Sequence, residues 1–207
     1  MQVVTVIFLI DTSGSMYGNK IAALNASMVE CWETLRAYSR KHKGLLKIGY
    51  ATFDEKMSTI MFVPNMEEAE APQFSVDKRS DGYYALTSFR CIYEGIENYI
   101  KNRKDKDATH CFYLVTDGKP VDSLKYTEIM EQVKSTDVFR HAKRIAAVVE
   151  KDSNSVDKDL LEFVGYKADK VIELNHLSNE VEQMLTWEFE DASDTNDSNA
   201  KYDSIFG

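Results

Sequence analysis

An unbroken apolar run at residues 3–10, Val-Val-Thr-Val-Ile-Phe-Leu-Ile, limits how this chain can fold more than any other feature. The run is rich in β-branched side chains and does not alternate with polar residues, so it predicts a central strand buried on both faces. Strands of this kind belong to sheets that helices cover on both sides, and such sheets bind ligands at the carboxyl ends of their strands. Functional residues are therefore expected just after position 10.

A cluster of oxygen-bearing side chains follows this predicted strand directly. Asp11, Ser13 and Ser15 supply one carboxylate and two hydroxyls at alternate positions, and Gly14 allows a sharp turn of the backbone. Hard oxygen ligands suit Mg²⁺. Asp and Ser after a strand are also common helix N-caps, so this motif alone is a weak match.

Two later segments add oxygen ligands in the order that one known site requires. Thr87 precedes a helical pattern, and Asp117 ends a second apolar run. With the D-x-S-x-S pattern of Asp11, Ser13 and Ser15, they resemble the metal-ion-dependent adhesion site of von Willebrand factor type A domains. The resemblance covers residues 1–190. By its short layout, the chain looks most like the bacterial members associated with tellurium resistance and related stress systems.

The resemblance implies how the metal is held. Ser13 and Ser15 bind Mg²⁺ directly, Thr87 does so in the ligand-ready state, and Asp11 and Asp117 act largely through coordinated waters. Mn²⁺ and Ca²⁺ are the alternatives to Mg²⁺. Neutral hydroxyl ligands leave a divalent ion electrophilic, so an Asp or Glu of a partner protein can complete its coordination.

One departure from the family pattern affects the Thr ligand. The family often has a Gly-Gly pair just before this Thr, whereas Ala85 and Leu86 stand there in this chain. Ser88 is therefore an alternative to Thr87.

Apolar spacing along the rest of the chain predicts alternating strands and helices. Strands are expected at residues 46–53, 110–116, 144–149 and 170–174, with a hairpin partner at 57–63 and a further short strand at 73–76. Helices are expected at residues 21–35, 89–100, 126–133, 156–164, ended by Gly165, and from an N-cap at Ser178 onward. This order predicts a three-layer α/β/α fold with a mainly parallel central sheet. One antiparallel edge strand is expected of the resembled fold.

The chain length suits one domain, predicted at residues 1–190. Residues 191–207 are rich in Asp, Ser and Asn, without an apolar period, and predict an acidic disordered tail. The tail ends on apolar residues 202–206, which are either a frayed terminus or a short docking motif.

Composition excludes several classes of partner. The net charge is -9 and the basic residues form no continuous stripe, which argues against nucleic acid or an anionic membrane as a partner. The densest basic stretches, residues 40–43 and 101–104, fall at the ends of predicted helices and complement their dipoles. Cys31, Cys91 and Cys111 are widely spaced within apolar patterns and predict reduced core residues. The first apolar run is too short to cross a membrane and lacks a basic leader, so a cytoplasmic location is expected.

These observations predict a Mg²⁺-dependent protein–protein interaction module. The resemblance to the tellurium-resistance type implies a scaffold in phosphorylation signalling beside a protein kinase and a PP2C-like phosphatase. An assembly or chaperone-like factor for a metal-dependent complex would use the same site and is the alternative.

Catalysis is not expected. A phosphohydrolase of the haloacid dehalogenase type needs a second Asp two residues after its nucleophile, where this chain has Ser13. The four histidines are scattered, and the sequence has neither a Gly-rich phosphate loop nor a nucleophile elbow. A metal-bound water would have no proton acceptor.

Overall fold

A computed structural model of the chain describes residues 3–104, 108–118, 120–122, 126–150 and 157–191. The strands are β1 (Val4–Asp11), β2 (Leu46–Phe53), β3 (Met61–Phe62), β4 (Thr109–Thr116), β5 (Lys143–Val148) and β6 (Val171–Glu173). The α-helices are α1 (Asn19–Lys41), α2 (Phe89–Asn102), α3 (Thr127–Ser135), α4 (Asp137–His141), α5 (Lys158–Phe163) and α6 (Leu177–Thr186). Shorter helical turns are η1 (Gly14–Met16), η2 (Ala168–Lys170), η3 (Leu174–His176) and the π-helical η4 (Trp187–Asp191).

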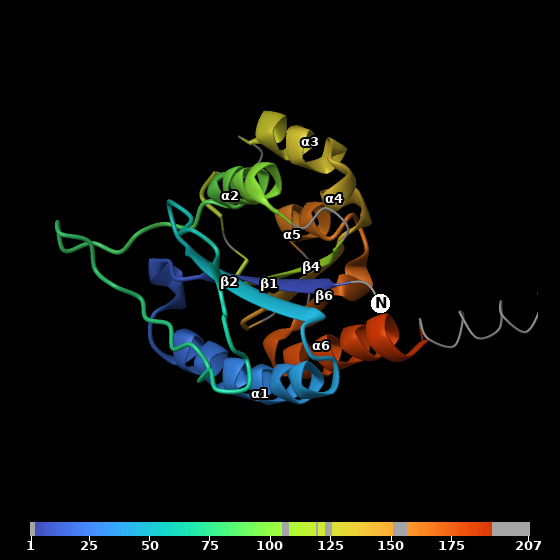
Figure 1. Ribbon diagram of the computed structural model, residues 1–207. Coiled ribbons are helices and arrows are strands. Elements are labelled where there is room, and N and C mark those ends of the chain that lie inside the picture. Colours follow the sequence, from blue (N-terminus) through green and yellow to red (C-terminus); the bar gives the residue numbers. More distant parts are fainter. Residues whose placement is uncertain (1–2, 105–107, 119, 123–125, 151–156, 192–207) are drawn as a thin grey trace, which may run out of the picture.

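The strands form one mixed sheet in the order β3-β2-β1-β4-β5-β6. All neighbouring pairs are parallel except β2 and β3, which pair antiparallel at the edge. Helices α1 and α6 cover one face of the sheet, and α2 to α5 cover the other (Figure 1). The predicted three-layer fold with one antiparallel edge strand is confirmed.

Strand β1 is buried along its whole length, as its sequence predicts. Successive side chains point to opposite faces. Val6 and Phe8 belong to the core on the side of α1 and α6, whereas Ile7 and Leu9 belong to the core on the side of α2. The run shows no polar alternation because both of its faces need apolar contacts.

The segment predicted as a short strand at residues 73–76 forms no strand. It passes beside α1, where the Asn25 side chain accepts from the Phe74 N–H at 2.8 Å and donates to the Phe74 carbonyl at 2.9 Å. The side chain thus satisfies backbone groups that a neighbouring strand would otherwise pair with. The hairpin partner predicted at 57–63 is present but reduced to Met61–Phe62.

The predicted helices are present, but their boundaries differ: α1 extends to Lys41 beyond the predicted end at 35, and the predicted start at 156 lies outside the described residues. Gly165 follows α5 with φ +71°, a conformation that suits the end of a helix. Ser178 is not an N-cap, because α6 already begins at Leu177. The 3₁₀ turn η3 leads directly into α6, and the Ser178 hydroxyl lies 3.3 Å from the Thr34 hydroxyl of α1. Helix α4 was not predicted.

Two expectations from composition concern the cysteines and membrane-spanning segments. Cys31, Cys91 and Cys111 are buried free thiols. None of the helices described is both long and apolar enough to cross a membrane. The tail predicted at residues 191–207 lies outside the described residues from 192 onward.

Helix α1 offers a matched test of the core. Leu24 is fully buried, whereas Val29 on the same helix is 44% exposed. We expect Leu24→Ala to lower the free energy of unfolding by about 2–5 kcal/mol, because it leaves a cavity in the core. Val29→Ala should change it by less than about 0.5 kcal/mol. Urea unfolding of both variants measures the difference, and similar values would contradict the packing of α1 on the sheet.

Candidate metal centre

The predicted ligands lie at the switch point of the sheet. From β1 the chain passes through α1 to β2 on one side, while β4 pairs with β1 on the other side. The loops that follow β1 and β4 therefore diverge and leave a crevice at the carboxyl ends of these strands. The loop before α2 brings Thr87 to the same place, within reach of Ser13.

Asp11 is the last residue of β1, and its side chain is fully buried. One carboxylate oxygen accepts from the Ser13 N–H at 2.9 Å, and the other accepts from the Thr116 hydroxyl at 2.6 Å. The Thr116 hydroxyl also accepts from the Gly118 N–H at 3.0 Å. Asp11 thus joins the loop after β1 to the loop after β4.

The three hydroxyls of the predicted ligand set converge. The Ser13 hydroxyl lies 2.6 Å from that of Thr87 and 3.1 Å from that of Ser15. Ser13 and Thr87 are buried, whereas Ser15 is exposed. This arrangement places one solvent-facing oxygen beside two enclosed ones.

Gly14 allows the two loops to approach each other. Its N–H donates to the Ala85 carbonyl at 2.8 Å, and a Cβ added at Gly14 would lie only 2.4 Å from Tyr84 Cβ. Any larger residue would force these loops apart. The close approach places Thr87 against Ser13 although Ala85 and Leu86 replace the usual glycines.

Ser88, the alternative to Thr87, is engaged elsewhere. It precedes α2, and its hydroxyl donates to the Asp122 carboxylate at 2.7 Å. Asp122 also accepts from the N–H groups of Phe89 and Arg90 at 3.0 and 3.1 Å, so it satisfies the first turn of α2. Of the two candidates, the structure brings Thr87 to the hydroxyl cluster. Asp122 was not among the residues expected at the site.

Asp117 lies directly after β4 with its side chain 1% exposed. One carboxylate oxygen accepts from the Lys20 ammonium at 3.0 Å, and the other has no hydrogen-bond partner among the described residues. Lys20 also lies 3.7 Å from Glu150. Lys20 was not predicted as a site residue. Its position could have indicated one, because a cation in the first turn of α1 is unfavourable with the helix dipole unless it has an acidic partner.

Burial dominates the electrostatics of Asp11. It raises the pKa of this carboxyl to about 6, against the hydrogen bonds from Thr116 and Ser13, which lower it; the nearby Asp117 charge adds to the rise. The ionised carboxylate is therefore poorly solvated, and a cation near it would stabilise it.

The residues fit a hard divalent cation. Around an octahedral Mg²⁺ with ligands at about 2.1 Å, adjacent oxygens lie about 3 Å apart, close to the separations of the three hydroxyls. One oxygen of Asp117 is buried without a hydrogen-bond partner among the described residues, so it could accept a bond from a further group. The described residues contain no group of three or more His, Cys, Asp or Glu that could hold a metal ion, so hydroxyls make up most of the candidate donors.

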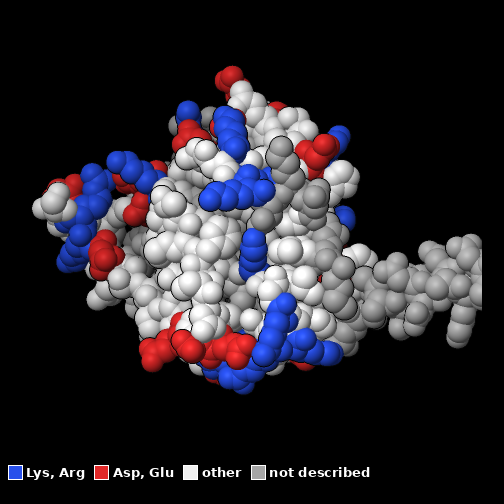
Figure 2. All heavy atoms as spheres, in the orientation of Figure 1, with Lys and Arg blue, Asp and Glu red and all other residues white. Residues whose placement is uncertain are grey.

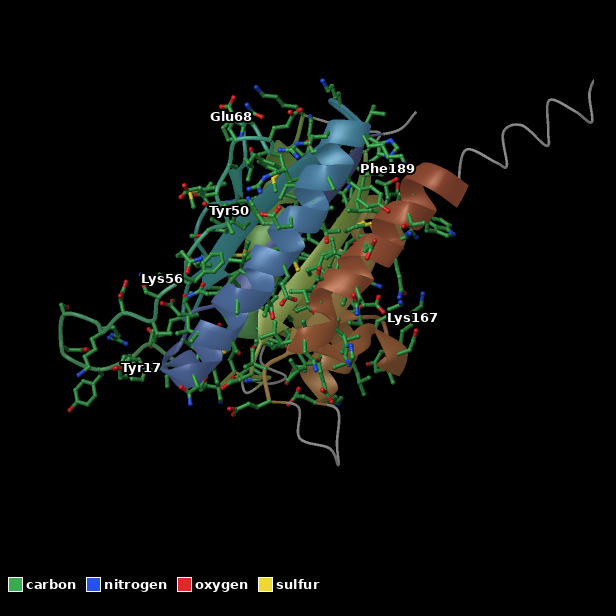
Figure 3. The ribbon with its side chains drawn as sticks, turned by 90° about the horizontal axis from the view of Figure 1, so that it is seen from below. Tyr17, Tyr50, Lys56, Glu68, Lys167 and Phe189 are labelled. Carbon is green, nitrogen blue, oxygen red and sulfur yellow. The ribbon has the colours of Figure 1, made fainter. Side chains whose placement is uncertain are left out.

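Aromatic side chains surround the loops. Tyr17 is 63% exposed and packs against Tyr84, with ring centroids 5.3 Å apart, and Tyr83 is 74% exposed. Tyr17 lies at the amino end of α1, far from Phe189 at the end of the α6 segment (Figure 3). The tyrosines thus both pack the loops together and present apolar surface beside the hydroxyl cluster.

Comparison with known structures places the fold. Pilus adhesin SpaC from Lactobacillus rhamnosus GG, in an open conformation, is similar with a TM-score of 0.65 and 10% identity over 91% of this chain and 30% of that chain. A von Willebrand factor type A protein from Catenulispora acidiphila has a TM-score of 0.57 and 12% identity over 89% and 42%. Proximal thread matrix protein 1 from the mussel byssus, with a zinc-occupied metal-ion-dependent adhesion site, has a TM-score of 0.55 and 12% identity over 90% and 46%.

This chain spans less than half the length of each of these three proteins, and identities this low show a shared fold alone. A search of curated proteins finds no match. A family model described as von Willebrand factor type A domain matches residues 5–185, which is most of the chain. Domains of this family are metal-dependent protein-interaction modules and are generally not catalytic. The chain therefore belongs to the von Willebrand factor type A domain family.

Proposed function

We propose that Asp11, Ser13, Ser15, Thr87 and Asp117 form a metal-ion-dependent adhesion site that binds one Mg²⁺, with Mn²⁺ or Ca²⁺ as alternatives. The observation that carries the proposal is the convergence of three hydroxyls at the end of the sheet where the buried Asp11 and Asp117 follow their strands. Bound there, the metal would supply an electrophilic position for an acidic ligand.

The ligand that fits this position is a carboxylate of a protein partner. Two carboxylates balance a divalent charge, but Asp117 already receives the Lys20 ammonium at 3.0 Å. Part of the negative charge of the site is thus taken up by the protein itself. An Asp or Glu from a partner can then add its charge to the metal without crowding the site with anions. Tyr17 and Tyr83 offer exposed aromatic surface for the same partner.

The setting that we propose is a cytoplasmic scaffold in bacterial stress or defence signalling, acting with a protein kinase and a PP2C-like phosphatase. Its support is the resemblance of the short motif layout over residues 1–190 to tellurium-resistance-associated proteins. An assembly or chaperone-like factor for a metal-dependent complex remains the alternative.

We further propose that the site is not catalytic. A phosphohydrolase would need an acid/base two residues after Asp11, and the Ser13 hydroxyl there contacts Thr87 and Ser15. Two histidine side chains make hydrogen bonds elsewhere: His110 bonds the Tyr99 hydroxyl, and His141 bonds the Asp137 carbonyl of its own helix. A general base for a metal-bound water is thus lacking among these groups.

Calorimetric titration of Mg²⁺ and Mn²⁺ into chelator-stripped protein tests the site. We expect saturable binding of one ion, lost in Asp11→Ala and strongly weakened in Ser13→Ala. Thr12→Ala is the matched control, because the Thr12 hydroxyl faces the Phe53 carbonyl at 3.3 Å and should leave binding unchanged.

The same proteins test the ligand. With Mg²⁺ present, the immobilised chain should retain Glu-containing peptides and not their Gln counterparts, and a chelator should release them. Metal binding without this preference would refute the carboxylate partner while leaving the metal site intact.

Replacement of Lys20 tests its competition with the metal. Because its ammonium already neutralises the charge of Asp117, we expect Lys20→Met to tighten metal binding by about fivefold. This factor corresponds to about 1 kcal/mol, the upper end of the range for exposed ion pairs. Lys101→Met removes a more exposed ion pair with Glu97 on α2, away from the site, and should have no effect. Weaker metal binding in Lys20→Met would instead show that Lys20 orients Asp117 for the metal.

The raised pKa of Asp11 predicts a pH dependence in metal-stripped protein. Its pKa is about 6 in the folded chain against an ordinary 3.8, so the folded state holds the proton more tightly. The resulting stabilisation is complete below about pH 4 and is lost as the pH rises to about 6. Between about pH 4.5 and pH 7, the free energy of unfolding should fall by about 2 kcal/mol more than in Asp11→Asn. Urea unfolding in chelator measures this, and parallel curves would contradict it.

A further inference from the structure

A groove of about 780 Å³ lies between α2 and the β2–β3 edge of the sheet. Its apolar lining comes from the edge segment and from α2, and includes Met57, Ile60, Phe62 and Tyr99. Phe62 is 45% exposed, so this lining is open to solvent. Thr5 near the start of β1 also lines the groove, whereas the metal loops follow the other ends of the strands. The groove is thus separate from the candidate metal centre.

The charged residues that line the groove are basic, whereas the chain as a whole is acidic. Lys47, Arg103 and Lys104 line it, and none of its described lining residues is Asp or Glu, although the chain carries a net charge of -9. The face shown in Figure 2 has a broad uncharged area, with Lys and Arg side chains close to it. An occupant that combines apolar side chains with negative charge would match this surface.

The described chain ends against the carboxyl end of α1. Phe189 in η4 stacks on His42 with ring centroids 4.3 Å apart, and His42 lies two residues before Gly44, which lines the groove. A second hollow of about 240 Å³ is lined by Ser39 and Lys43, on either side of His42. It shares four lining residues with the larger groove: Gly44, Leu46, Val63 and Pro64. The two hollows therefore adjoin and form one depression, which begins next to the end of α1 that Phe189 contacts and which Glu67 also lines.

We propose that residues 192–207 of the same chain dock in this groove. The segment carries Asp194, Asp197 and Asp203 against one basic residue, Lys201, so its net charge is opposite to that of the basic lining. Ile205 and Phe206 match the apolar lining. Sixteen residues span up to roughly 50 Å when extended, enough to follow the depression and enter the groove. A tether of this kind keeps the segment at roughly millimolar effective concentration, so weak contacts suffice.

The docked segment does not depend on the metal. The groove is formed by residues other than the five proposed ligands, and its occupant is recognised by apolar and basic side chains. Docking is therefore expected in the presence of a chelator, which separates a failure of this proposal from a failure of the metal site.

Disulfide trapping in the full chain tests the proposal. Ser204→Cys is combined with Asn98→Cys in the groove, and in a control protein with Asp169→Cys, which is exposed in η2 at the same end of the sheet. The native cysteines are buried, so they should not compete. Under mild oxidation in chelator, we expect the groove pair to form an intramolecular disulfide at least about tenfold faster than the control pair.

Two further variants separate docking from chance encounters. Phe206→Asp should reduce the rate of the groove pair to that of the control pair, and Lys47→Glu should slow it several-fold; thermal unfolding verifies that both variants fold. Equal rates for the two pairs would overturn the proposal. Disulfides that link two chains and not one would also overturn it, because they would make a second copy the source of the occupant.

Discussion

The buried carboxylate of Asp11 is the constraint on which the candidate site depends. Its two oxygens accept from Ser13 in its own loop and from Thr116 at the end of β4, so one side chain fixes the relative position of two loops that the sheet topology sends apart. Burial makes the ionised form of this group costly, as the raised pKa shows. At the proposed metal site, a proton and a divalent ion would therefore compete for this carboxylate. One residue at the end of a fully buried strand thus determines both the position of the loops and the charge between them.

Much of this arrangement is predictable from sequence because it follows from local patterns. The apolar run of β1 shows a strand covered on both faces, and a strand of that kind must end at a loop facing the crevice of the sheet. Asp11, Ser13 and Ser15 need only this one strand to be placed. Thr87 and Asp117 were expected from the resemblance to the family motif, because the alternation of helices and strands predicts a parallel sheet but not which strands are neighbours.

The contacts that escaped prediction all join residues far apart in the chain. Lys20 reaches Asp117, Asp122 reaches the first turn of α2, and Asn25 takes the place of a strand partner for Phe74. A local pattern shows that Asn25 lies on a helix but not which backbone will pass beside it. The wrong strand at residues 73–76 and the wrong N-cap at Ser178 have the same origin. At residues 73–76 the long-range contact with Asn25 satisfies backbone groups that local propensity assigned to a neighbouring strand. At Ser178 the preceding 3₁₀ turn takes the place of the predicted N-cap.

The proposed metal site should stay open to an acidic residue of a partner, whereas the proposed groove should bind an acidic segment of this chain. Because the two sites lie apart, both conditions can be met. A metal with a position open to Asp or Glu would accept such a residue from any flexible acidic segment within reach. Residues 192–207 of this chain carry three Asp and are attached to the same domain, so they are the nearest competitor for a partner's carboxylate. The described chain ends at the opposite end of α1 from Tyr17 (Figure 3), and the charged residues that line the groove are all basic. Docking there would hold the acidic segment away from the metal and leave the open position to a partner.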